Sequence, residues 1–157
     1  MTPAVVAAQQ AAIEFRIHEY RHDPAAPSYG EEAAQALGVT AERVFKTLIV
    51  ELEGKPRQLA VAVVPVAKQL DLKALASASG AKKAAMAKAE EAERATGYVL
   101  GGISPLGQRK RLVTVLDASA REFTTIYVSA GRRGLEIELS PLDLQRLTDA
   151  RLAPIAR

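Results

Sequence analysis

The stretch VFKTLIVELEGKPRQLAVAVV, residues 44–64, decides the fold because two apolar, β-branched runs flank a turn. The runs at 44–52 and 58–64 have the composition of buried strands. Between them, residues 53–56 (EGKP) carry the glycine and proline that are typical of a chain reversal. We therefore expect these two runs to form a β-hairpin.

Helical and strand patterns alternate on both sides of this hairpin. Ser28 and Glu31 have the spacing of a capping box, and Gly38 follows at the end of the helical pattern. Ser140-Pro141 similarly provides an N-cap and a proline at the first helical position. Helices are expected at 3–13, 28–38, 71–78, 87–95 and 141–149, and further strands at 15–20, 112–116, 124–128 and 135–139.

The order of these elements indicates an α+β domain, because the strands occur in hairpins with helices inserted between the groups. A mixed, strongly curved, barrel-like β-sheet flanked by helices would satisfy that order. No repeat, linker or low-complexity tract divides the sequence, so residues 1–157 are expected to form a single domain.

The composition excludes several classes of protein. The chain contains no cysteine, which excludes disulfides, thiolate metal sites and a cysteine nucleophile. No apolar run approaches the ~20 residues of a membrane span, and no secretory signal is visible, so we expect a cytoplasmic protein without membrane contact. The net charge of +3 includes clusters at 109–111 and 132–133, which either hold a phosphate backbone or are solvated surface charge.

The histidines do not indicate a catalytic triad or a metal centre. His18 and His22 are the only two, and no GxSxG nucleophile elbow accompanies them, so we interpret both as surface or packing residues. Without cysteine or a second ligand pair, two histidines four residues apart form half a metal site at best. The sequence also lacks the Walker and Rossmann glycine patterns, and no cofactor is expected.

Lys46 stands out because it is a cation inside the apolar run at 44–50. Strand alternation places it on the face of Val44 and Leu48, opposite Thr47. An ammonium among apolar neighbours is unfavourable unless it pairs with an anion, which would suit a functional cleft. A lysine that snorkels outward from an edge strand is the alternative interpretation.

Two glycine-containing segments could bring the main chain close to a ligand. Residues 101–107 (GGISPLG) offer successive N–H groups that can hold an anion, such as the oxyanion of an acyl-transfer reaction. Residues 126–134 (IYVSAGRRG) bring the hydroxyl of Ser129 and two arginines to a glycine turn. Each segment taken alone is also consistent with a simple chain reversal.

A set of longer stretches extends through nearly the whole chain. They are MTPAV at the start, HDP at 22–24, FKTLIV at 45–50, LAVAVVPVAKQLDLK at 59–73, GAKK at 80–83, TGYVLGGISPLGQRKRL at 96–112 and EFTTIYVSAGRRGLEIEL at 122–139. In this order, the stretches closely resemble the YbaK/EbsC family of aminoacyl-tRNA deacylases.

This resemblance implies a domain like the editing insertion of bacterial prolyl-tRNA synthetase, which hydrolyses the ester between a wrong amino acid and the terminal ribose of tRNA. The family's catalytic positions match Lys46, Gly101 and Gly102, and its substrate-binding positions match Tyr20, Thr47 and Ser129. Glu136 departs from the family, because an aspartate is expected there. Glutamate keeps the charge and adds one methylene.

The resemblance also implies that the chain removes mischarged cysteine from tRNA(Pro), with Cys-tRNA(Cys) as a second candidate substrate. Because no enzyme nucleophile is evident, the substrate thiol is expected to attack its own ester carbonyl and leave as a thiolactone, with water as the alternative nucleophile. Lys46 would hold the ribose-phosphate end or the carbonyl, and the amides of Gly101 and Gly102 would receive the oxyanion.

The expected partners are the aminoacylated 3′ end of tRNA and prolyl-tRNA synthetase, because so small a domain offers few phosphate contacts of its own. Two alternatives remain open at this point. One is a non-catalytic module that binds tRNA or a synthetase, and the other is a deacylase for alanine or another small amino acid.

Overall fold

The computed structural model describes residues 1–26 and 28–157 and has the α+β character expected from the sequence. The helices are α1 (Pro3–Gln10), α2 (Tyr29–Leu37), α3 (Leu72–Ala78), α4 (Ala89–Thr96) and α5 (Pro141–Thr148), with one 3-10 helix at Ala118–Glu122. The strands are β1 (Phe15–Glu19), β2 (Phe45–Leu52), β3 (Gln58–Pro65), β4 (Ala84–Met86), β5 (Val113–Asp117), β6 (Ile126–Arg132), β7 (Leu135–Leu139) and β8 (Arg151–Ala153).

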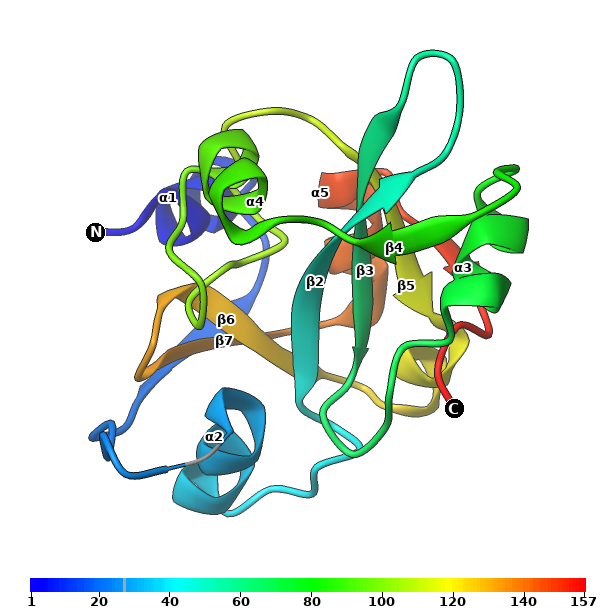
Figure 1. Cartoon of the computed structure of the whole chain (residues 1–157). Coiled ribbons are helices and arrows are strands. Elements are labelled where there is room, and N and C mark those ends of the chain that lie inside the picture. The colour runs from blue at the N-terminus through cyan, green and yellow to red at the C-terminus, as the bar shows by residue number, and fades with distance from the viewer. Residues whose placement is uncertain (27) are drawn as a thin grey trace.

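The described strands form two sheets, and neither of them closes into a barrel. A three-stranded antiparallel sheet has the order β1-β7-β6, and a five-stranded mixed sheet has the order β4-β2-β3-β5-β8. The sheets meet where Val44, immediately before β2, forms a parallel bridge with Tyr127 of β6. The expected barrel-like single sheet is thus replaced by two sheets that join at one corner (Figure 1).

The expected hairpin is confirmed, since β2 pairs with β3 along its whole length, from Phe45 opposite Pro65 to Leu52 opposite Gln58. Strand alternation divides the hairpin between two hydrophobic cores. One face, including Ile49, packs against the three-stranded sheet together with α1, α4 and α5. The other face, including Val50, packs against α3 and the C-terminal segment.

A third and smaller core fixes α2 beside the corner where the sheets meet. Ala33 and Ala34 of α2 pack with Val44, Val66 and Tyr127. Figure 1 shows α2 standing apart from the other helices, next to the beginning of β2. This helix therefore forms one side of the region in which β2 enters the sheet.

The packing of α2 is tight at Gly30. A Cβ added there would come within 2.2 Å of Val66 Cγ1, so the close approach of α2 to the residue that follows β3 depends on the missing side chain.

Several boundaries differ from the expectations. The first helix ends at Gln10 rather than residue 13, and Ser28 is an N-cap whose side chain makes no capping hydrogen bond, so the expected capping box is wrong. The strand expected at 124–128 covers Ile126–Arg132 and includes a β-bulge between Ser129 and Arg132. Strands β4 and β8 were not expected, because three residues are too few for a recognisable alternation.

Candidate active site

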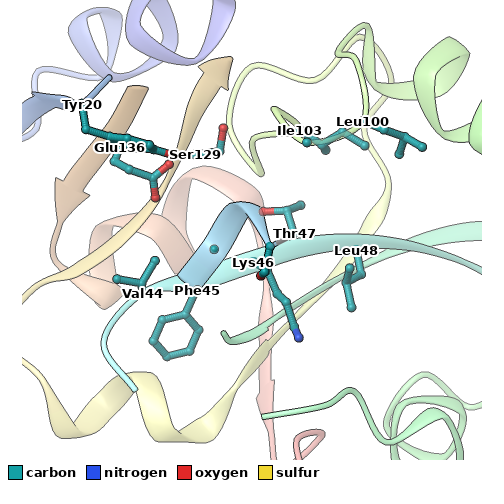
Figure 2. A pocket seen from close by; sticks show the side chains of 13 residues that line it. Tyr20, Val44, Phe45, Lys46, Thr47, Leu48, Leu100, Ile103, Ser129 and Glu136 are labelled. Atoms are coloured by element: carbon teal, nitrogen blue, oxygen red, sulfur yellow. The ribbon is translucent and has the colours of Figure 1, made fainter. Parts of the chain in front are cut away.

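A pocket of about 390 Å³ lies at the corner between the two sheets. This volume falls within the range of small-molecule sites. The walls come from five segments of the sequence: the residue after β1, the start of α2, the first half of β2 with the residue before it, the loop that follows α4, and the β6–β7 hairpin (Figure 2). The lining residues are Tyr20, Ser28, Gly30, Val44, Phe45, Lys46, Thr47, Leu48, Leu100, Gly101, Ile103, Ser129 and Glu136.

Of the seven residues that the resemblance assigns to the site, six line this pocket and Gly102 does not. Sequence reasoning missed the other seven lining residues, of which Val44, Phe45 and Leu48 are the apolar neighbours of Lys46 and Thr47. Ser28 and Gly30 belong to a helix start whose distance from β2 the sequence does not reveal, and Leu100 and Ile103 are ordinary apolar residues beside the glycines.

Lys46 is half-buried, and its side chain leaves β2 on the side opposite to Thr47. Figure 2 shows the Lys46 ammonium directed away from Ser129 and Glu136, whereas the Thr47 side chain turns toward Ile103. Burial lowers the pKa of the Lys46 ammonium, and the nearby Glu31 carboxylate partly opposes that change. The ammonium therefore lies at the margin of the pocket rather than against its carboxylate.

Glu136 is a carboxyl group in the pocket wall with only 6% of its surface exposed. Burial raises the pKa of Glu136 to about 8, and no hydrogen bond or ion pair of its side chain occurs in the described part of the chain. A group in this condition is protonated at neutral pH while the pocket is empty, and it would ionise when a cation is brought to it.

Tyr20 and Ser129 flank Glu136 on the same face of the three-stranded sheet. Burial, followed by the nearby Glu136 carboxyl, raises the pKa of the Tyr20 phenol, so the phenol remains a hydrogen-bond donor at neutral pH. The Ser129 hydroxyl donates to Gly102 C=O at 3.2 Å and accepts from Gly131 N–H at 3.1 Å. Ser129 therefore ties β6 to the glycine loop, and among the described residues no side-chain base hydrogen-bonds to its hydroxyl to make it a nucleophile.

Of the two adjacent glycines, only Gly101 has an N–H without a hydrogen-bond partner among the described residues. Gly101 lines the pocket with a φ of 90°, which favours glycine. The N–H of Gly102 already donates to Val99 C=O at 3.0 Å, so the expected pair of oxyanion donors is wrong at this position. Gly102 instead permits close packing, because a Cβ there would lie 2.8 Å from Arg132 Cα.

An ion cluster outside the pocket connects three of its walls. The Glu32 carboxylate of α2 lies 3.0 Å from His22 Nδ1 and 3.3 Å from Arg133 Nε, and it accepts a hydrogen bond from Asp23 N–H at 2.7 Å. Although burial acts in the opposite direction, these donors hold the pKa of Glu32 below its ordinary value. The cluster fixes the segment after Tyr20 and the β6–β7 turn to α2.

The two histidines are structural, as the sequence suggested. His18 Nε2 lies 2.9 Å from Glu138 Oε1, and its ring packs on Tyr127 at a centroid distance of 5.2 Å. His22 belongs to the Glu32 cluster. Neither histidine lines the pocket, and the described residues contain no group of three or more potential metal ligands.

The fold and the pocket together define an α+β domain with a small, mostly apolar site that contains one buried carboxyl, one half-buried ammonium and an open glycine amide. Comparison with known families shows to which family this domain belongs. Residues 23–147 match the family model described as the aminoacyl-tRNA editing domain. The chain therefore belongs to this family of YbaK-type editing domains, which confirms the resemblance noted in the sequence.

Individual relatives agree with this membership. The chain is 43% identical over 125 residues to EbsC of Enterococcus faecalis, whose name describes it as a candidate Cys-tRNA(Pro)/Cys-tRNA(Cys) deacylase; the match covers 80% of this chain and 75% of EbsC. It is 28% identical over 150 residues to the multifunctional Ser/Thr-tRNA deacylase ProXp-y of Escherichia coli, covering 94% and 87% of the two chains.

A solved structure, described as that of a candidate trans-editing enzyme for prolyl-tRNA synthetase, superimposes with a TM-score of 0.81 at 25% identity. The superposition covers 100% of this chain and 99% of the other. The domain is thus an aminoacyl-tRNA editing domain of the deacylase type that acts in translation fidelity. No helix among the described residues is long and apolar enough to cross a membrane.

Proposed function

We propose that this chain is a trans-editing hydrolase that removes mischarged cysteine from tRNA(Pro), and also from tRNA(Cys), by cleaving the aminoacyl ester. The observation that carries the proposal is the pocket, which is large enough for an aminoacyl group and has a buried carboxyl at Glu136 and Gly101 in its lining. The 43% identity to EbsC supports cysteine as the amino acid.

In this proposal, the substrate provides the nucleophile. The cysteine sulfur attacks the ester carbonyl carbon, the bond from that carbon to the ribose oxygen breaks, and the thiol proton ends on the ribose oxygen. The product is a four-membered thiolactone, which water then opens to free cysteine. The absence of cysteine from the sequence, and the engagement of the Ser129 hydroxyl by Gly102 and Gly131, support a route without an enzyme nucleophile.

The pocket residues have distinct roles in this scheme. The Gly101 N–H stabilises the negative charge that develops on the carbonyl oxygen. The Glu136 carboxyl receives the α-ammonium, which restores its ionised form. Tyr20, Thr47 and Ser129 orient the aminoacyl group.

Lys46 holds the terminal ribose-phosphate of the tRNA rather than the ester carbonyl. This choice is supported by the direction of its ammonium, which leaves β2 on the side away from Glu136 and Ser129 (Figure 2). A half-buried ammonium gains strongly from an anionic partner, because a phosphate oxygen replaces the water that burial removes.

The expected partners are the aminoacylated 3′ end of tRNA and, for tRNA specificity, prolyl-tRNA synthetase. The latter is supported by the likeness to the candidate trans-editing enzyme for that synthetase. A role in translation would place the protein in the cytoplasm. No cofactor takes part in the proposed reaction.

The test is to incubate the purified protein with Cys-, Ser-, Ala- and Pro-charged tRNA(Pro) and to follow the loss of each label. The thiol route predicts rapid loss from Cys-tRNA(Pro) alone. Retention of all four labels, together with measurable tRNA binding, would instead favour a non-catalytic binding module.

A deacylase for serine or threonine is the second candidate, because ProXp-y is similar over 94% of this chain. Neither amino acid carries a thiol, so water would be the nucleophile. Loss of the serine label at a rate equal to that of cysteine would favour this candidate and exclude the thiol route.

A further inference from the structure

Strand β2 has one edge that is only partly paired. On one side, all of its residues pair with β3. On the other side, Val44 bridges to Tyr127, and the pairing with β4 begins where Ala87 N–H donates to Ile49 C=O at 3.0 Å. Between these two points, residues 45–48 have no strand partner on this side within 1–26 and 28–157, and these residues line the pocket.

The hydrogen-bond pattern of β2 determines which main-chain groups face the open edge. Val44 C=O accepts from Val66 N–H at 2.8 Å, so the even-numbered residues of β2 exchange hydrogen bonds with β3. The odd-numbered residues turn their N–H and C=O outward, as Ile49 does toward Ala87. The N–H and C=O of Thr47 therefore point into the pocket, and neither has a hydrogen-bond partner in the part of the chain that the structure describes.

Thr47 also carries a third polar group without a partner. Its side-chain oxygen is buried and makes no hydrogen bond to any described residue. Buried polar groups in proteins are nearly always paired, and an unpaired one needs an explanation. This buried hydroxyl, together with the unpaired N–H and C=O of the same residue in a pocket wall, indicates a place that a polar ligand completes.

The open edge matches the main-chain atoms of an amino acid. An L-aminoacyl ester has a donor at its α-nitrogen and an acceptor at its carbonyl oxygen, separated by one Cα, as in any residue of a strand. In an antiparallel ladder, two such residues exchange both of their hydrogen bonds directly. Peptide ligands bind to exposed strand edges by this same pairing.

We propose that the main chain of Thr47 binds the aminoacyl group as if it were the next residue of a strand. The Thr47 N–H donates to the ester carbonyl oxygen, and the Thr47 C=O accepts one hydrogen bond from the α-ammonium. This inference rests on the proposed function and deepens it, because it identifies the substrate atoms that are recognised.

Such a contact separates two tasks in the pocket. The Thr47 main chain recognises what all L-aminoacyl esters share, so discrimination between amino acids falls to the side chains of the other walls. The α-ammonium has three N–H groups, and after one bonds to Thr47 C=O another remains for the Glu136 carboxylate. The ligand class is thus an α-amino acyl group with a free ammonium.

The experiment uses stable 3′-amide analogues of the charged tRNA end. L-Cysteinyl-3′-aminoadenosine contains both recognised groups, and its 3-mercaptopropionyl counterpart lacks only the ammonium. Binding of each to the ¹⁵N-labelled wild-type protein is followed by NMR. We expect the cysteinyl analogue to bind at least about tenfold more tightly, which is typical of a hydrogen bond to a charged group.

The Thr47 amide provides the direct readout. With the cysteinyl analogue bound, its proton should shift downfield and exchange with solvent at least about fivefold more slowly. The amide of Leu48, which faces β3, is the internal control and should change little. The variant Thr47→Val should keep the preference between the two analogues, because the main chain remains.

Two results would overturn the inference and leave the proposed function intact. They are an unchanged Thr47 amide when the analogue binds, and equal affinity for both analogues, each in a protein that deacylates Cys-tRNA(Pro). Failure of both analogue binding and deacylation would contradict the proposed function itself.

Discussion

Glu136 is the register partner of Ser129 across the β6–β7 ladder, so both side chains leave the three-stranded sheet on one face and line the pocket. The two strands are joined by a tight turn, and their pairing shifts register between Ser129 and Arg132. A carboxyl group is thereby fixed beside the glycine loop, in surroundings that raise its pKa to about 8.

This pKa predicts how stability depends on pH. A carboxyl whose pKa is raised on folding binds more protons in the folded state, so the free energy of unfolding decreases as the pH rises from about 4.5 to about 8. Glu136→Gln should remove this dependence and stabilise the empty protein at pH 8 by on the order of 1–3 kcal/mol. Urea unfolding at pH 5, 6.5 and 8 measures the effect.

Glu138 is the matched control on the same strand. Although burial acts in the opposite direction, the hydroxyl of Thr125 and the ring of His18 hold its pKa below the ordinary value. The stability that the Glu138 carboxylate adds is present above the pKa of the unfolded chain and is lost as the pH falls through the pKa of the folded protein. Glu138→Gln should therefore destabilise most at neutral pH. If the free energy of unfolding changed equally with pH in Glu136→Gln and Glu138→Gln, the raised pKa would not belong to Glu136.

The sequence predicts the centre of this fold better than its edges. The β2–β3 hairpin follows from its composition and turn residues, and alternation along β2 correctly separates Lys46 from Thr47. The parallel pairing of β5 with β3, and the three-residue strands β4 and β8, depend on long-range contacts that leave no local pattern.

Six of the thirteen residues that line the pocket were expected from the sequence, whereas the hydrogen bonds around them were not. The family motif places Gly101 and Ser129 in the site, where both are found. The use of Gly102 N–H by Val99, however, depends on a turn within the loop that residue types alone do not fix. The Glu32–His22–Arg133 cluster was missed because Arg133 lies about a hundred residues after Glu32 in the sequence, and no local pattern brings the two together.

Gly102→Ala should disrupt the contact between the glycine loop and the β6–β7 turn. Its Cβ would lie 2.8 Å from Arg132 Cα and 3.1 Å from Arg133 N, and main-chain atoms cannot rotate away. We expect a loss of about 1–3 kcal/mol in stability and a fall in deacylation, because the loop carries Gly101. Gly54→Ala in the β2–β3 turn is the control, since its Cβ meets only Pro56 O at 3.3 Å.

Glu32→Gln should loosen the segment after Tyr20. The substitution removes the charge that binds His22 and Arg133, and we expect a stability loss of about 1–3 kcal/mol, measured by thermal unfolding. Glu31→Gln, one residue earlier on the same helix, is the control and should change stability little. If both variants unfold at the temperature of the wild type, the cluster does not hold the segment.

Lys46→Ala should lower kcat/KM for Cys-tRNA(Pro) by about 10–100-fold, the range for loss of a charged hydrogen bond to phosphate. Lys46→Arg keeps the charge and should retain more activity. Single-turnover deacylation at several salt concentrations checks this, since loss of a phosphate contact also reduces the salt dependence. Lys68→Ala, at an exposed lysine, is the control. Near-full activity of Lys46→Ala would contradict the proposed role.

Thr47→Val separates stability from function at a single atom. The Thr47 hydroxyl is buried without a partner, so its replacement by a methyl group should stabilise the empty protein by on the order of 1 kcal/mol. Thr96→Val is the matched control, because the Thr96 hydroxyl donates to Ala92 C=O at 2.8 Å and its loss should not stabilise. Deacylation should fall in Thr47→Val, because the variant lacks the hydroxyl that we expect to bind the substrate. If Thr47→Val were more stable and equally active, the Thr47 hydroxyl would not bind the substrate.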